Sequence, residues 1–188
     1  MATVQGVRTA ARAPAAAGRV LLGTLALAAS ARLALPLAPV PVTGQTLAVL
    51  LVGVLLGRRD GTVSVLSYLA AGAAGLPVFT AGGGLAYLLG PTGGYLLGFL
   101  PAVWLAGELA ERGWTARPGS CLLLMALSLG AVFACGLAWL SLYVPAGRLL
   151  GAGLLPFLPG EALKMVLAAL IVCRRRRPRC PRWPAMAT

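Results

Sequence analysis

Apolar segments of nearly membrane-spanning length follow one another along almost the whole chain. A helix needs about 20 apolar residues to cross the hydrocarbon core of a bilayer. Of the 188 residues 59% are hydrophobic, and the mean hydropathy is +0.88, whereas soluble domains are about 45–50% apolar. Because the chain has too few polar residues to cover a soluble fold, we expect one integral membrane domain and no separate soluble module.

Proline- and glycine-rich stretches divide this apolar sequence. Proline lacks the backbone donor that a helix needs, so "PLAPVPVTGQ", "AGGGLAYLLGPTGGY" and "LPFLPG" are expected to interrupt helices. The first apolar segment resembles a signal peptide, but further segments follow, so we expect it to be retained as a span. Six transmembrane helices are expected at about residues 20–37, 46–57, 62–80, 95–110, 120–143 and 159–173.

The basic residues are distributed unevenly between the two sides of this arrangement. Thirteen of the 16 bases fall on one side, while Arg148 falls on the other and Arg32 and Lys164 fall within spans. The positive-inside rule then places both termini in the cytoplasm. We expect a cytoplasmic arm at residues 1–19, a membrane domain at 20–173 and a basic cytoplasmic tail at 174–188. The thirteen bases are Arg8, Arg12, Arg19, Arg58, Arg59, Arg112, Arg117, Arg174, Arg175, Arg176, Arg177, Arg179 and Arg182.

The composition excludes several classes of function. The net charge of +12 could indicate nucleic acid, but no basic stretch alternates with aromatic residues as in a stacking platform, so no nucleic-acid partner is expected. The chain has no His and no C-x-x-C pair among its four cysteines, so no metal site is expected. It has no G-x-S-x-G motif, no paired carboxylates within the spans and no Walker motif. We therefore expect neither an enzyme nor an ATPase.

Two opposite charges stand inside the last apolar segment. Glu161 and Lys164 precede Arg174 by thirteen and ten residues, about 20 and 15 Å along a helix, within a hydrocarbon core about 30 Å thick. Their i,i+3 spacing puts both on one helix face, and an ionisable group at such depth costs about 2.5–3.5 kcal/mol. We interpret the pair as the polar groups that bind a ligand in a cavity. The alternative is an ion pair that only neutralises itself.

Other segments are expected to complete this cavity. Pro156, Pro159 and Gly160 are expected to interrupt the helix just before Glu161. Non-helical backbone at membrane depth is tolerated only where protein or a water-filled cavity covers it. The glycines of "GGG" at 82–84 and "GPTGGY" at 90–95 allow positive-φ backbone close to another group, so we expect these segments to form a second wall of the cavity. The alternative is that they form only a turn between two helices. The expected fold class is an all-α membrane protein with six transmembrane helices, whose glycine/proline-rich outer loops cover a ligand cavity.

Four of these stretches resemble a known family. "PVPVTGQTLAVLLVGVLLG", "SYLAAGAAGLPVF", "LLGPTGGYLLGF" and "FLPGEALK" are similar to segments of the BioY proteins, the biotin-binding S components of energy-coupling-factor (ECF) transporters. The resemblance implies high-affinity capture of biotin on the outer side and uptake across the bacterial cytoplasmic membrane. It also implies an ECF membrane subunit and two ATPase subunits as partners, or self-association in a member that lacks them. Biotin is then the transported ligand, and no cofactor is expected.

The resemblance also assigns roles to residues. Its acidic position falls on Glu161, where the family commonly has Asp, and its lysine falls on Lys164. Phe79, Tyr95 and Trp104 are candidate apolar walls. The alternatives are an S component for thiamine or riboflavin, an intramembrane enzyme, or a structural membrane protein. The predicted substrate-binding residues are Glu161, Lys164, Gly93, Gly94, Tyr95, Thr43 and Gln45, and the predicted partner-docking residues are Ala26 and Ser30, with small residues nearby on the first helix.

Overall fold

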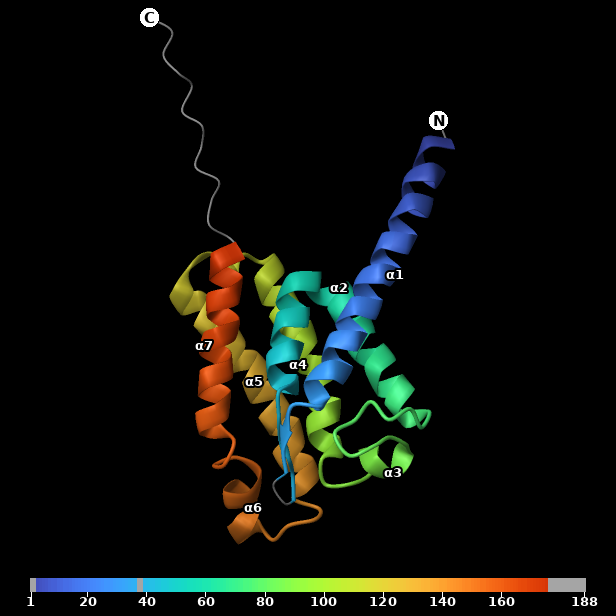
Figure 1. The fold of residues 1–188 in the computed structure, drawn as a ribbon. Coiled ribbons are helices and arrows are strands. Elements are labelled where there is room, and N and C mark those ends of the chain that lie inside the picture. Colours follow the sequence, from blue (N-terminus) through green and yellow to red (C-terminus); the bar gives the residue numbers. More distant parts are fainter. Residues whose placement is uncertain (1–2, 37–38, 176–188) are drawn as a thin grey trace, which may run out of the picture.

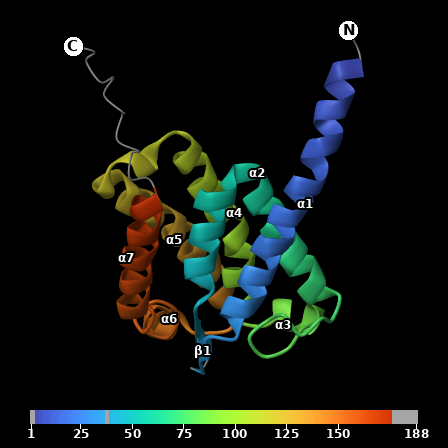
Figure 2. The ribbon, with the colours of Figure 1, turned by 45° about the horizontal axis from the view of Figure 1, so that its top comes forward.

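Long helices packed side by side make up most of the computed structural model, which describes residues 3–36 and 39–175, with side chains for 15–36 and 39–174 (Figure 1). The start of α1 and the end of α7 lie at the same end of the bundle, and the strands, α3 and α6 lie at the other (Figures 1 and 2). We call the latter the loop end. In chain order the elements are α1 (Thr3–Ala31), β1 (Ala34–Leu35), β2 (Val42–Thr43), α2 (Gln45–Ala73), α3 (Leu85–Leu88), α4 (Gly93–Glu111), the 3-10 helix η1 (Trp114–Ala116), α5 (Pro118–Leu140), α6 (Ala146–Gly153) and α7 (Leu158–Arg175).

Helices occupy the expected positions, but two predicted ends are wrong. The first span was expected to reach residue 37, whereas α1 ends at Ala31, and Ala34 then pairs with Thr43 in the antiparallel hairpin β1–β2. The third was expected to reach residue 80, whereas α2 ends at Ala73 because Gly75 takes a φ of 97° and starts a loop. Arg32 therefore lies in the loop end after α1, and not within a span as predicted.

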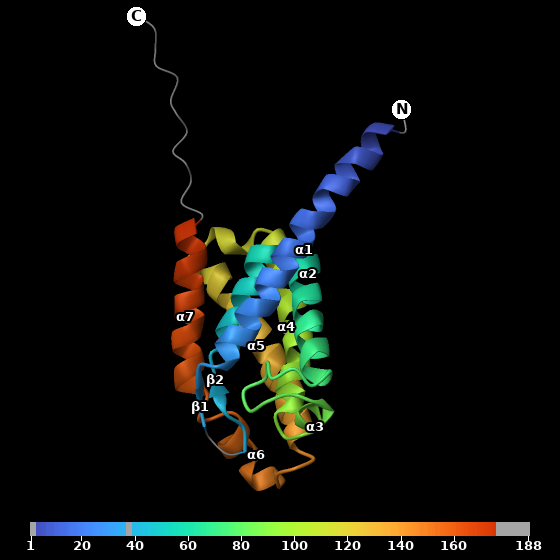
Figure 3. The ribbon, with the colours of Figure 1, turned by 45° about the vertical axis from the view of Figure 1, so that its right-hand side comes forward.

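Gly57 turns α2 back on itself. Its backbone is non-helical, with φ 81° and ψ 175°, a conformation that side chains other than glycine's rarely adopt. The arms 45–56 and 58–73 run in opposite directions from this point (Figure 3). Oε1 of Glu111 accepts a hydrogen bond of 2.8 Å from the backbone N–H of Arg58, which satisfies a donor at the start of the second arm. The second and third predicted spans are therefore joined by a single non-helical residue.

The bundle is centred on α4, which packs between α2 and α5, while α1 packs on α2 and α7 packs on α2 and α5. Small residues let these helices approach closely, as is common in membrane bundles. A Cβ atom on Gly53 would lie 2.8 Å from the Ala106 side chain, and one on Gly98 would lie 3.0 Å from the backbone of Val132. The close α2–α4 and α4–α5 packing therefore depends on glycine at these positions.

Length and composition identify α4 and α5 as helices able to cross a membrane within the described part of the chain. The α6 and α7 pair qualifies as a third span if its 41° bend is a break within one span, and 15–31 of α1 is a shorter apolar helix. The structure therefore confirms an all-α membrane fold with helices at all six predicted positions. The count of six transmembrane spans stays a prediction.

Ion pairs gather at the end of the bundle opposite the loop end. Arg19 pairs with Asp60 at 2.6 Å, and Glu108 pairs with Arg58 at 2.7 Å and Arg112 at 2.8 Å. These residues belong to the side that was predicted to be cytoplasmic. The division into residues 1–19, 20–173 and 174–188 and the membrane orientation stay predictions. Of the predicted bases, Arg176, Arg177, Arg179 and Arg182 lie outside the described residues, as do the side chains of Arg8, Arg12 and Arg175.

Candidate ligand-binding site

Glu161 stands in the first turn of α7, where the sequence predicted a broken helix. The chain leaves α6 at Gly153, and α7 begins at Leu158, with the Glu161 N–H donating to the Phe157 carbonyl at 2.9 Å. The positive end of a helix dipole favours a carboxylate here. Glu161 is 3% exposed, so its charge is almost entirely removed from solvent.

Lys164 and Thr46 hold one oxygen of this carboxylate. Oε1 of Glu161 accepts hydrogen bonds from Nζ of Lys164 at 2.6 Å and from Oγ1 of Thr46 at 2.9 Å. The Lys164 ammonium also donates to the Thr43 carbonyl and, at 3.2 Å, to Oγ1 of Thr46. These contacts fasten α7 to the end of β2 and the start of α2.

The two charged groups differ in what they leave unsatisfied. An ammonium has three donors, and Lys164 has three acceptors in Glu161, Thr43 and Thr46. Oε2 of Glu161 is buried and has no hydrogen-bond partner among the described residues. A buried acceptor left unpaired costs about 1–3 kcal/mol, and more when it is charged. The arrangement thus offers a strong acceptor for a donor from a ligand.

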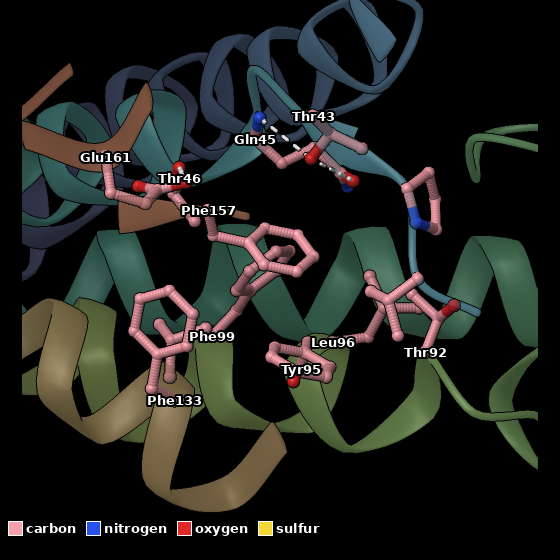
Figure 4. Close-up of a pocket in the computed structure, with 13 residues that line it drawn as sticks. Thr43, Gln45, Thr46, Thr92, Tyr95, Leu96, Phe99, Phe133, Phe157 and Glu161 are labelled. Atoms are coloured by element: carbon pink, nitrogen blue, oxygen red, sulfur yellow. Dashed lines mark hydrogen bonds between the residues drawn. The ribbon is translucent and has the colours of Figure 1, made fainter. Parts of the chain in front are cut away.

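A narrow cavity, which we call the inner cavity, begins at this carboxylate. Polar side chains lie along one wall, and aromatic side chains of α4 and α5 face them (Figure 4). The cavity volume open to water is about 40 Å³, whereas pockets for small molecules have volumes of about 300–1,000 Å³. A vitamin-sized ligand therefore requires the walls to separate. The lining residues are Val40, Pro41, Thr43, Gln45, Thr46, Thr92, Tyr95, Leu96, Phe99, Val132, Phe133, Phe157 and Glu161.

Three aromatic rings pack together at the apolar wall. Tyr95 and Phe157 are stacked, with ring centroids 6.1 Å apart, and Phe133 meets both edge-on at 6.2 and 6.1 Å. The Tyr95 hydroxyl points away from the inner cavity and donates to the Gly153 carbonyl at 2.7 Å. Tyr95 therefore offers its ring to the inner cavity and ties α4 to the end of α6.

Gln45 and Thr43 extend the polar wall. Gln45 is 3% exposed, its Nε2 donates to the Tyr68 hydroxyl at 2.7 Å, and its Oε1 accepts from the Thr43 hydroxyl at 3.2 Å. Tyr68 donates in turn to the Val78 carbonyl at 3.2 Å. The Gln45 side chain is therefore buried and hydrogen-bonded, and is not solvated at a membrane surface.

Gly93 and Gly94 are not among the lining residues. A Cβ atom on Gly93 would lie 1.7 Å from the Leu88 carbonyl oxygen, and one on Gly94 would lie 2.1 Å from Cβ of Trp139. Both glycines stand in the first turn of α4 without positive φ. They serve close packing of α4 against α5 and against the preceding turn, and the expectation that they border a ligand finds no support in this geometry.

Other predicted residues lie away from the inner cavity. Phe79 is fully buried between Tyr68 and Tyr87, and Trp104 is 46% exposed on the outside of α4. Ala26 and Ser30 line an apolar groove between α1 and α2. The groove is compatible with their predicted docking role, which stays a prediction.

Several lining residues were not selected from the sequence. Thr46, Phe99, Phe133 and Phe157 were not among the predicted residues. Phe99 follows Tyr95 by one helical turn and Phe157 precedes Glu161 by four residues, so spacing could have indicated these two. Phe133 had no such signal, because only tertiary packing brings α5 to this wall.

Comparison with known proteins identifies the family. The model of the BioY family matches residues 6–179. The chain belongs to the BioY family. It is similar to the "Biotin transporter BioY" of Thermotoga maritima, with 37% identity over 160 residues that cover 82% of this chain and 91% of that protein. It is also similar to the BioY biotin transporter of Rhizobium etli, with 36% identity over 142 residues that cover 71% and 76%.

A solved structure supports the same assignment. The fold matches that of "the S-component for biotin from an ECF-type ABC transporter" with a TM-score of 0.75 and 31% identity, over 94% of each chain. The expected all-α membrane fold is therefore confirmed. BioY relatives are transporter components, so the prediction that this chain is not an enzyme is confirmed as well.

Proposed function

We propose that this protein captures biotin on the outer side of the cytoplasmic membrane and delivers it for uptake as the substrate-specific subunit of an ECF-type transporter. Oε2 of Glu161, a buried acceptor without a partner at the inner cavity, carries the proposal. The ureido ring of biotin carries N–H donors, and one of them would satisfy this oxygen. Membership of the BioY family favours biotin over other vitamins.

Lys164 is then a positioning residue. Its three donors hold Oε1 of Glu161, Thr43 and Thr46, so it fixes the carboxylate with the other oxygen free. Lys164 could donate a hydrogen bond to the ureido carbonyl of biotin only by giving up one of these contacts. The apolar thioether ring fits the wall that Phe99, Phe133 and Phe157 form.

Transport requires partners outside this chain. The sequence has no Walker motif, so energy would come from an ECF membrane subunit and two ATPase subunits. The apolar groove between α1 and α2, with Ala26 and Ser30 among its lining residues, is the proposed docking face. Small residues allow close helix–helix approach within a membrane.

Copurification tests the function most simply. The protein is purified in detergent from cells grown with biotin, and mass spectrometry identifies the small molecules that accompany it. We expect biotin in near-equal amount to the protein. Binding of biotin, thiamine and riboflavin to the ligand-free protein is then compared by calorimetry. Preference for thiamine or riboflavin would transfer the proposal to that vitamin, and binding of none would end it.

A further inference from the structure

A second pocket adjoins the inner cavity at the loop end. It offers about 600 Å³ of room for water, and Pro41 and Thr92 line both spaces. The β1–β2 hairpin and the loops beside α3 lie together at this end (Figure 3). We call this space the outer pocket. A ligand with one end at Glu161 that extends past Thr92 would enter it. The outer pocket is lined by Ala31, Arg32, Ala34, Pro36, Pro39, Pro41, Thr80, Ala81, Tyr87 and Thr92.

The two spaces are lined by charges of opposite sign. Glu161 is the single charged residue that lines the inner cavity, and Arg32 is the single charged residue that lines the outer pocket, among the described residues. A ligand with a hydrogen-bond donor at one end and a carboxylate at the other would match both.

Arg32 has unused capacity for such a carboxylate. One guanidinium nitrogen donates to the Pro77 carbonyl, a neutral acceptor that does not neutralise the charge. Arg32 forms no ion pair with any residue that the structure describes. A guanidinium has five N–H donors in a fixed fork, so donors remain for a bidentate contact with a carboxylate.

Lys164 is the other cation near the inner cavity, and it is a weaker candidate. It is bound to Glu161, and its three donors already have three acceptors. To meet a carboxylate it would have to release one of them, and the incoming anion would lie beside the Glu161 carboxylate. Repulsion between two carboxylates at such a site disfavours this arrangement.

We propose that Arg32 binds the carboxylate of the ligand in the outer pocket and thereby selects for the free acid. The inference rests on the proposed function, since it takes biotin as the ligand and its ureido ring at Glu161. Thr80 and Tyr87 line the same pocket. The Thr80 hydroxyl already donates to Oε1 of Gln45 at 3.5 Å, so Tyr87 is the proposed donor to the second carboxylate oxygen.

A ligand with a blocked carboxyl group tests the role of Arg32. Calorimetry in detergent compares biotin and biotin methyl ester on the wild type, Arg32→Gln and Arg32→Lys. Arg148→Gln is the matched control, because Arg148 is exposed at the same end but lines neither space. We expect Arg32→Gln to lower biotin affinity at least about tenfold, to the affinity of the ester. Ester affinity should not change.

The other variants separate charge from geometry. Arg32→Lys keeps the charge without the fork, so we expect a smaller loss for biotin and none for the ester. If Arg32→Gln does not fold, the same selective loss in Arg32→Lys carries the test. If the Arg32 variants lose the same affinity for biotin and for the ester, Arg32 only supports the loop at Pro77. If neither affinity changes, Arg32 does not contact the ligand. Either result overturns the inference. A wild type that binds no biotin overturns the proposed function instead.

Discussion

Lys164 holds Glu161 by one oxygen and leaves the other free. Nζ of Lys164 lies 2.6 Å from Oε1 of Glu161, while Oε2 is buried without a partner among the described residues. An ion pair that served only to neutralise itself would need no cavity beside it. Here the unpaired oxygen belongs to a residue that lines one, and this favours recognition over simple neutralisation.

Thr46 should matter for binding, although it carries no charge. Its hydroxyl donates to Glu161 and accepts from Lys164. Thr46→Val removes both contacts, at about 0.5–1.5 kcal/mol for each hydrogen bond and about 1–3 kcal/mol together, so we expect biotin affinity to fall at least about fivefold. Calorimetry measures the loss.

Thr62→Val is the control for Thr46→Val. The Thr62 hydroxyl donates to the Arg58 carbonyl at the opposite end of the bundle, so its removal should not change binding. Equal affinities of the wild type and Thr46→Val would contradict the importance of the contacts around Oε1.

Gly94 should affect stability through α4–α5 packing. A Cβ atom there would lie 2.1 Å from Cβ of Trp139 and 2.8 Å from the Cys135 carbonyl oxygen. Such overpacking typically costs about 1–3 kcal/mol, so Gly94→Ala should unfold at a lower temperature in detergent. Gly130→Ala, also in a helix but with nothing within 4 Å of its added Cβ, should not lower the midpoint. If both variants unfold alike, the close packing at Gly94 is unimportant.

The sequence indicated those features that depend on neighbouring residues. Glu161 and Lys164 share a helix face because of their spacing, and proline places the start of α7 just before them. The contact between Thr46 and Glu161 spans 115 positions, and no local pattern encodes it. The wall of Tyr95, Phe133 and Phe157 likewise comes from separate elements.

Glycines were the hardest residues to interpret. Gly57 turns α2 with a positive φ, whereas Gly94 is helical and is required for space. Both roles follow from the absence of a side chain, and sequence alone does not distinguish them. Gly94 was therefore assigned to the ligand site, whereas its geometry shows a packing role, and the turn at Gly57 was expected to be a longer loop.

The membrane orientation can be measured with a reporter that is active only outside the cytoplasm. Thirteen bases belong to the side predicted to be cytoplasmic, and with Arg32 in the loop end two lie opposite. The positive-inside rule therefore still applies. A fusion within the loop at Arg117 should be inactive, and one at Arg148 should be active. The reverse pattern would contradict the orientation.

The groove between α1 and α2 should be needed for transport but not for binding. Ala26 is exposed and lines this groove. Ala26→Trp fills it with a bulky side chain, so uptake of labelled biotin by cells with all transporter subunits should fall while calorimetric affinity stays unchanged. Leu25→Trp is the control, because Leu25 is exposed on α1 but does not line the groove. Loss of uptake in both variants, or of binding in Ala26→Trp, would contradict this role.

Biotin binding to the wild type and to Glu161→Gln tests the central claim most directly. The amide removes the negative charge and replaces one acceptor oxygen with a donor. We expect saturable one-to-one binding by the wild type and an affinity at least about tenfold lower, 1.4 kcal/mol, for a folded Glu161→Gln variant. If the folded variant binds biotin as tightly as the wild type, Glu161 is not the ligand's acceptor and the account of the site is wrong.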